Sequence, residues 1–114
     1  MEINGEIVND QVRYADLGLS PELMRAIDKK GYVQATPVQG GSIPYFMEYK
    51  DVIAKAPTGT GKTFAFGIPM VEHIDPESRD VQGLVLAPTR ELAIQIRDEL
   101  RDLCAFRDGV RVVC

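Results

Sequence analysis

Apolar residues recur along much of this chain at the spacing of a helix. They fall every three or four positions in residues 20–30, 37–47 and 89–103, which predicts three amphipathic helices. A fourth helix is expected over residues 62–73, directly after a glycine-rich break. Four helices therefore account for much of the sequence.

Three short apolar runs lie between these helices and predict strands, at residues 51–54, 83–87 and 110–114. Residues 83–87 are apolar throughout, so we expect this strand to be buried on both faces. Strands that alternate with helices are typical of a parallel sheet with right-handed crossovers. The predicted fold is α/β, with three α/β/α layers and a mainly parallel sheet.

Capping residues mark where the helices begin. Ser20 and Thr36 each precede a proline, and a good N-cap before proline at the first helical position is a typical start signal. Thr89 has the same role before the last helix, and Gly31 ends the first. Pro44 lies inside the second helix and would kink it unless that helix is short.

Composition narrows the classes of protein that fit. A chain of 114 residues makes one domain, and a net charge of −4 excludes a protein that binds nucleic acid mainly by bulk positive charge. No apolar run is long enough to span a membrane, and the first residues lack the features of a signal peptide. Cys104 and Cys114 are expected to be buried and reduced, which favours a cytoplasmic protein. Residues 1–13 are interpreted as a lead-in segment.

The sequence APTGTGKT at residues 56–63 follows a predicted strand and opens a predicted helix, the context that a phosphate-binding P-loop requires. Glycines let the backbone approach phosphate oxygens, and N–H groups at the helix start point at the anion. Lys62 is expected to reach the outer phosphates of ATP, and the Thr63 hydroxyl to bind Mg²⁺. The alternative is a glycine-rich turn that happens to precede Lys-Thr.

Gln39 has two interpretations. A glutamine amide can donate to and accept from adenine at once, and Tyr32 can stack on the base. Thr36 and Gln39 also have the spacing of a capping box, and spacing alone favours that structural role. The two roles are not exclusive.

With these residues in view, the sequence resembles the DEAD-box RNA helicases. Residues 31–39 are similar to the Q motif of that family, and Tyr14, 25 residues before Gln39, stands where the family usually has phenylalanine. Residues 56–63 match its motif I, and residues 88–93 (PTRELA) match its motif Ia. The resemblance covers residues 14–114 and implies the N-terminal part of the first RecA-like helicase domain.

The resemblance implies roles along the chain. The predicted nucleotide site comprises Tyr14, Tyr32, Gln39, Pro57, Thr58, Gly59, Thr60, Gly61, Lys62 and Thr63, with Lys62 and Thr63 also acting in catalysis. The predicted RNA contacts are Pro88, Thr89 and Arg90. Arg90 lies in the first turn of its helix, where a cation opposes the helix dipole, so it is better placed to meet a phosphate than to stabilise the helix. The alternatives are a solvated surface arginine and, for Thr89, a plain N-cap.

Three departures from the family pattern stand out. Tyr49 stands where the family usually has glycine, so it must avoid positive φ or accept strain. Ala35 replaces a common proline, and the Asp-Glu-Ala-Asp sequence is absent from residues 1–114.

The favoured function is therefore the ATP-binding portion of an ATP-dependent RNA helicase that remodels RNA, with ATP and Mg²⁺ as cofactors. By itself this portion is expected not to hydrolyse ATP. The alternatives are a non-catalytic nucleotide-binding or oligomerising module and an unrelated P-loop enzyme such as a small kinase. The resemblance also implies that a strand between two of the predicted strands is missing, so the isolated chain is expected to form an exchanged or edge-paired oligomer, most simply a two-fold dimer. The alternative is a rearranged monomer in which the three strands close up.

Overall fold

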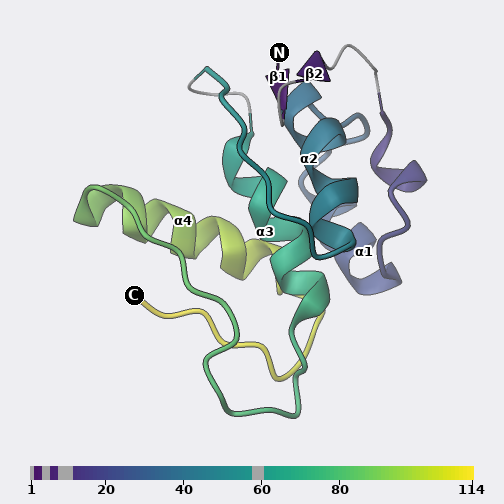
Figure 1. The fold of residues 1–114 in the computed structure, drawn as a ribbon. Helices are drawn as coiled ribbons and strands as arrows, with labels where there is room; N and C mark the ends of the chain where they lie inside the picture. The colour runs from purple at the N-terminus through teal and green to yellow at the C-terminus, as the bar shows by residue number, and fades with distance from the viewer. Residues whose placement is uncertain (1, 4–5, 8–11, 58–60) are drawn as a thin grey trace.

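A computed structural model describes residues 2–3, 6–7, 12–57 and 61–114. Four α-helices form most of this part of the chain (Figure 1): α1 (Pro21–Lys29), α2 (Pro37–Met47), α3 (Lys62–His73) and α4 (Arg90–Leu103). A short 3-10 helix, η1 (Tyr14–Asp16), precedes α1. Two short strands, β1 (Glu2–Ile3) and β2 (Glu6–Ile7), pair in antiparallel orientation near the N-terminus.

The helices begin where their caps predict. The Ser20 hydroxyl accepts a hydrogen bond from the N–H of Leu23 at 3.3 Å, and the Thr89 hydroxyl accepts one from Leu92 at 3.2 Å. Thr36 and Gln39 form a complete capping box at the start of α2. These predictions are confirmed, and they succeed because a cap depends on residues only three positions apart.

Helix α3 lies at the centre, with α2 on one side and α4 on the other (Figure 1). Gly67 allows the close approach of α3 and α4, because a Cβ there would lie 2.7 Å from Leu100 Cδ2. The largest fully buried side chains come from all four helices: Leu23, Ile27, Val38, Ser42, Ile43, Ile68 and Leu103. The core is therefore built by helices packing on helices.

The predicted parallel sheet is wrong for the part of the chain that the structure describes. Residues 51–54, 83–87 and 110–114 form no named strand, and no backbone hydrogen bond joins one of these segments to another. A strand is stable only when a neighbour receives its ladder of hydrogen bonds. The predicted three-layer α/β/α arrangement is replaced by a helical core with extended segments along it.

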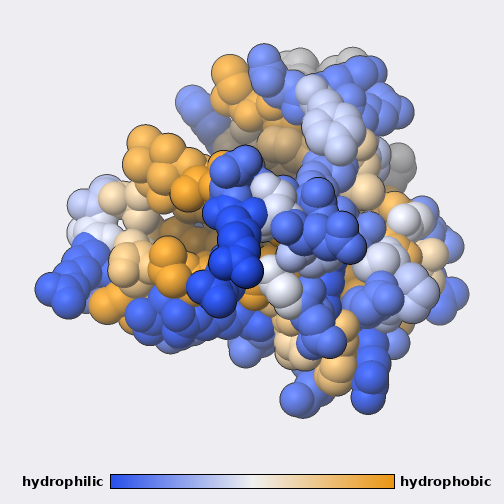
Figure 2. All heavy atoms as spheres, turned by 90° about the horizontal axis from the view of Figure 1, so that it is seen from below, coloured by the Kyte–Doolittle hydropathy of each residue, from blue (hydrophilic) through white to orange (hydrophobic). Residues whose placement is uncertain are grey.

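The expectation that residues 83–87 are buried on both faces is also wrong. Val85 and Ala87 pack against the core, whereas Leu84 and Leu86 are 76% and 85% exposed. This alternation is that of an extended chain with one covered face. Figure 2, seen from below, shows apolar side chains gathered around a hollow on this side of the molecule.

Tyr49 has a backbone conformation that residues other than glycine rarely adopt. Its φ is 61°, which is the strained conformation that the sequence raised as a possibility. The Tyr49 ring stacks on His73, with ring centroids 4.1 Å apart.

The two cysteines were expected to be buried. Cys104 is half-buried and Cys114 is exposed, so burial of both thiols is not observed. Among the described residues, no helix is long and apolar enough to cross a membrane.

Candidate nucleotide site

The side chain of Gln39 connects the start of α2 with the start of α3. It is 3% exposed, and its Oε1 accepts hydrogen bonds from the Thr36 N–H at 3.0 Å and from the Tyr14 hydroxyl. Its Nε2 donates to the carbonyl oxygen of Gly61 at 3.1 Å. Gln39, which completes the capping box of α2, is therefore also bonded to the residue that precedes Lys62.

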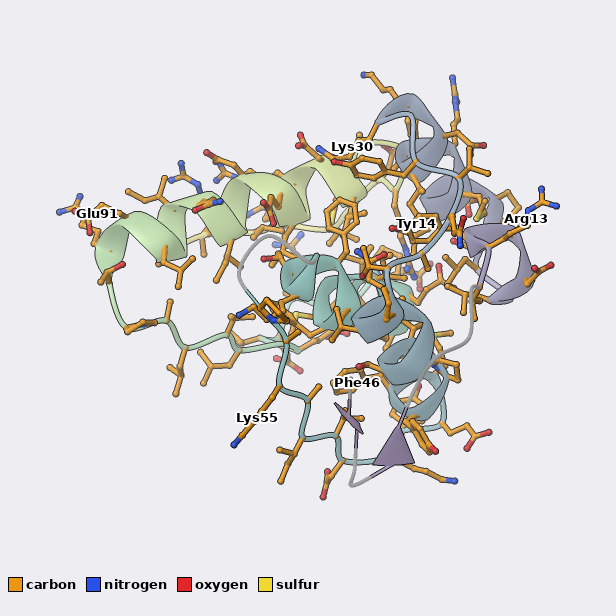
Figure 3. All side chains as sticks on the ribbon, turned by 90° about the horizontal axis from the view of Figure 1, so that it is seen from above. Arg13, Tyr14, Lys30, Phe46, Lys55 and Glu91 are labelled. Atoms are coloured by element: carbon orange, nitrogen blue, oxygen red, sulfur yellow. The ribbon has the colours of Figure 1, made fainter. Side chains whose placement is uncertain are left out.

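Tyr14 reaches Gln39 because the chain before η1 pairs with the loop before α2. The N–H of Ala35 donates to the Val12 carbonyl at 2.8 Å, and the N–H of Tyr14 donates to the Val33 carbonyl at 3.2 Å. Tyr14 turns inward whereas Arg13 points away from the molecule (Figure 3). Burial raises the pKa of Tyr14 to about 12, against the opposite effect of its bond to Gln39. The hydroxyl is therefore protonated at neutral pH.

Tyr32 lies beside the start of α3. Its ring meets the edge of Phe64 in a T-shaped contact, with centroids 5.9 Å apart, and remains 47% exposed. Lys30 lies over Phe64, with Nζ 5.8 Å from the ring centroid, and donates to Asp102 Oδ2 at 2.7 Å. That hydrogen bond raises the pKa of Lys30. The Tyr32 ring is therefore packed against Phe64, while part of it remains accessible to a ligand.

The predicted phosphate site includes the start of α3. Gly61 is its N-cap with φ of 80°, a left-handed conformation that favours glycine, and a Cβ there would lie 2.2 Å from Gln39 Nε2. Lys62 is exposed and Thr63 is half-buried in the first turn. Pro57 is exposed before the loop, and the predicted site residues Thr58, Gly59 and Thr60 lie outside the described residues.

The predicted RNA contacts lie at a different place. Pro88, Thr89 and Arg90 are all exposed at the N-terminus of α4. Figure 3 shows this end of α4, labelled by Glu91, far from Tyr14. Thr89 is confirmed as a cap, and contact with RNA stays a prediction for all three residues.

The structure brings Tyr14, Tyr32, Gln39, Gly61 and Lys62 to one region, around the start of α3. Sequence reasoning missed the contribution of Phe64, the bond between Gln39 and Gly61, and the hydroxyl of Tyr14 as a partner of Gln39. Only Phe64 carried a signal, since an aromatic two positions after Lys62 falls on the helix face that includes Ile68. No cluster of three metal-ligating side chains occurs among the residues described.

Comparisons with known proteins show the family to which this chain belongs. The family described as DEAD/DEAH box helicase matches residues 36–114. The DEAD-box ATP-dependent RNA helicase CshA of Bacillus subtilis is 55% identical over 89 residues, which cover 78% of this chain and 18% of that protein. The protein of the same name from Geobacillus kaustophilus is 51% identical over 100 residues, which cover 88% of this chain and 21% of its own length.

Two solved structures have a fold similar to that of this chain. A DEAD box protein from Methanococcus jannaschii has a TM-score of 0.79 at 34% identity, covering 90% of this chain and 28% of its own. S. cerevisiae Dbp5 bound to RNA and ADP BeF3 has a TM-score of 0.75 at 32% identity, covering 82% of this chain and 25% of its own. This chain spans about a fifth of the length of the curated relatives named above. The chain belongs to the DEAD/DEAH box helicase family.

Proposed function

We propose that this chain supplies the adenine- and phosphate-binding part of an ATP-dependent RNA helicase, which couples ATP binding and hydrolysis to RNA duplex unwinding or remodelling. The observation that carries the proposal is the bond from Gln39 to the Gly61 carbonyl. It joins a base-reading side chain to the N-cap of the helix that carries Lys62. A base and its phosphates are bound together only if the two subsites are held at a fixed separation, and this bond holds them.

The chemistry of the α3 N-terminus supports the phosphate part of the proposal. The first N–H groups of an α-helix have no partner within the helix, and the helix dipole favours an anion there. Lys62 would add a positive charge, and the Thr63 hydroxyl would be a ligand of Mg²⁺. When bound, Mg²⁺ neutralises charge on the phosphates.

RNA binding is proposed for the N-terminus of α4. Arg90 is exposed in the first turn, where its charge opposes the helix dipole and is available to a phosphate. The similar S. cerevisiae Dbp5 has been solved with RNA and ADP BeF3. We propose Pro88, Thr89 and Arg90 as residues of this chain that contact RNA.

The test is titration of a fluorescent ADP analogue followed by anisotropy. Lys62→Ala is expected to abolish binding, because it removes the charge that meets the outer phosphates. Lys55→Ala is the matched control, since Lys55 is exposed before the loop and points outward (Figure 3). Equal binding by Lys62→Ala and the parent chain would refute the phosphate site.

We propose further that residues 1–114 alone do not hydrolyse ATP. Phosphoryl transfer needs a carboxylate that holds the metal and a group that positions water, and the Asp-Glu-Ala-Asp sequence is absent from these residues. A phosphate-release assay with and without RNA is expected to show no turnover. Turnover that Lys62→Ala removes would contradict this expectation.

Self-association is the second candidate function, and a specific surface favours it. Leu84, Leu86 and Val113 are exposed along extended segments that border a hollow of about 880 Å³ (Figure 2). An extended apolar edge pairs with a second copy of itself in antiparallel orientation, which gives a two-fold dimer. Light scattering over a dilution series is expected to show a dimer that Leu86→Lys dissociates and Val33→Lys does not. A monomer at every concentration would refute this candidate.

A further inference from the structure

The orientation of the Gln39 amide is determined by its two backbone partners. The Thr36 N–H can only donate, so the side-chain atom 3.0 Å from it is the oxygen Oε1. The Gly61 carbonyl can only accept, so the atom 3.1 Å from it is the nitrogen Nε2. Reversing the amide would break both bonds.

This orientation makes the Tyr14 hydroxyl a donor. It lies against Oε1, which has no proton, so the hydroxyl must supply the hydrogen. Tyr14 is 2% exposed and its raised pKa keeps that proton in place at neutral pH. Both acceptor positions of Oε1 are therefore occupied, and, counting partners among the described residues, one Nε2 hydrogen is the remaining hydrogen-bonding capacity of the Gln39 side chain.

A single donor does not distinguish adenine from guanine. Both bases present N7 as an acceptor, and adenine differs by its 6-amino donor where guanine has an oxygen. To accept from that amino group, Oε1 must release one of its two donors. The Thr36 N–H is fixed by the capping box, whereas the Tyr14 hydroxyl can rotate about its C–O bond.

We infer that the Tyr14 hydroxyl is a positioning group that competes with the adenine 6-amino group for Gln39 Oε1 and thereby limits the preference of this site for adenine. The inference rests on the proposed nucleotide site. Tyr14 need not touch the nucleotide, because it acts through Gln39. Removing the hydroxyl frees one acceptor position on Oε1 and leaves the bonds to Thr36 and Gly61 in place.

The test compares two nucleotides that differ at the 6-position alone, ADP and purine riboside diphosphate, which has N7 and lacks the amino group. Tyr14→Phe is expected to tighten ADP binding about three- to tenfold, the value of one net hydrogen bond, and to leave purine riboside diphosphate unchanged. Tyr45→Phe is the control, since Tyr45 is a half-buried tyrosine of α2 whose ring contacts Lys50. Thermal melting establishes that each variant is folded.

The unmodified chain provides a second measurement that does not depend on a variant. It is expected to bind the two nucleotides within about threefold of each other, because the acceptor that would distinguish them is occupied. A preference for ADP above about tenfold would overturn the inference, as would an equal change for both nucleotides in Tyr14→Phe.

Failure of the inference and failure of the proposed function give different results. If the parent chain shows no ADP binding that Lys62→Ala removes, the proposed function is refuted and the inference with it. Lys62-dependent ADP binding that Tyr14→Phe weakens, or leaves unchanged, overturns the inference and leaves the proposed function standing.

Discussion

Replacing Gln39 by alanine tests whether this residue is more than a cap. Loss of the bond to the Thr36 N–H costs about 1 kcal/mol, the usual value of a helix cap. The buried Tyr14 hydroxyl also loses its partner, which costs a further 1–3 kcal/mol or so. The Gly61 carbonyl still accepts from the Ala65 N–H at 3.2 Å, so its loss is small. We expect Gln39→Ala to lower the free energy of unfolding by about 2–4 kcal/mol, against about 1 kcal/mol for a cap alone.

A double-mutant cycle with Tyr14→Phe isolates the part that belongs to the hydroxyl. In the phenylalanine background no hydroxyl is left unpaired, so Gln39→Ala is expected to cost about 1–3 kcal/mol less than in the parent chain. Urea unfolding followed by far-ultraviolet circular dichroism is a suitable assay, because four helices dominate the signal. The loss of side-chain volume at Gln39 is the same in both backgrounds and cancels.

The control cycle pairs Gln39→Ala with Tyr45→Phe, which removes a hydroxyl from another part of α2. It is expected to be additive within about 0.5 kcal/mol. Additivity of that size in the Tyr14 cycle would refute the reasoning, because the hydroxyl would then contribute nothing through Gln39.

Three further predictions concern the helical core. Gly67→Val is expected to lower the free energy of unfolding by about 1–3 kcal/mol in urea titrations, because its side chain would meet Leu100 between α3 and α4. Arg107 donates to two carbonyls at the end of α3, so Arg107→Met should lower it by about 2 kcal/mol, whereas exposed Arg111→Met should change it little. Folding raises the pKa of Tyr14 from 10.0 to about 12, so the protonated hydroxyl contributes fully to the free energy of unfolding below pH 10. That contribution is lost as the pH rises through 12, and thermal melts over this pH range should show no such loss for Tyr14→Phe.

The helices could be predicted from the sequence because their signals are local. Ser20, Thr36 and Thr89 each cap the helix that follows them, and every partner lies three residues away. The capping box at Gln39 was visible for the same reason. The other contacts of Gln39 could not be predicted, because Tyr14 and Gly61 lie 25 and 22 residues away along the sequence. The spacing of apolar and polar residues does not indicate contacts between residues that far apart.

The sheet could not be predicted correctly because a strand depends on neighbours that its own sequence does not contain. Residues 83–87 have the composition of a buried strand, yet Val85 packs on the core and Leu86 is exposed. β-Propensity reports whether a segment fits a pleated surface, and pairing decides whether that surface exists. Residues 83–87 are extended as expected, but they form no ladder of backbone hydrogen bonds with either of the other predicted strands.

The count of hydrogen-bonding positions on Gln39 changes how its two interpretations relate. Capping and base reading are compatible as long as each uses different atoms, and the capping box occupies one acceptor position of Oε1. The Tyr14 hydroxyl occupies the other, and Gly61 takes one of the two Nε2 hydrogens. A base that is to be recognised by its 6-amino group must therefore displace a bond that also stabilises the fold. A change that weakens the bond from Tyr14 to Gln39 therefore lowers the free energy of unfolding of the free chain. By linkage, the same change shifts the binding equilibrium toward the chain with adenine bound. Tyr14→Phe is thus expected to move stability and adenine preference in opposite directions, which a purely structural role for the hydroxyl would not produce.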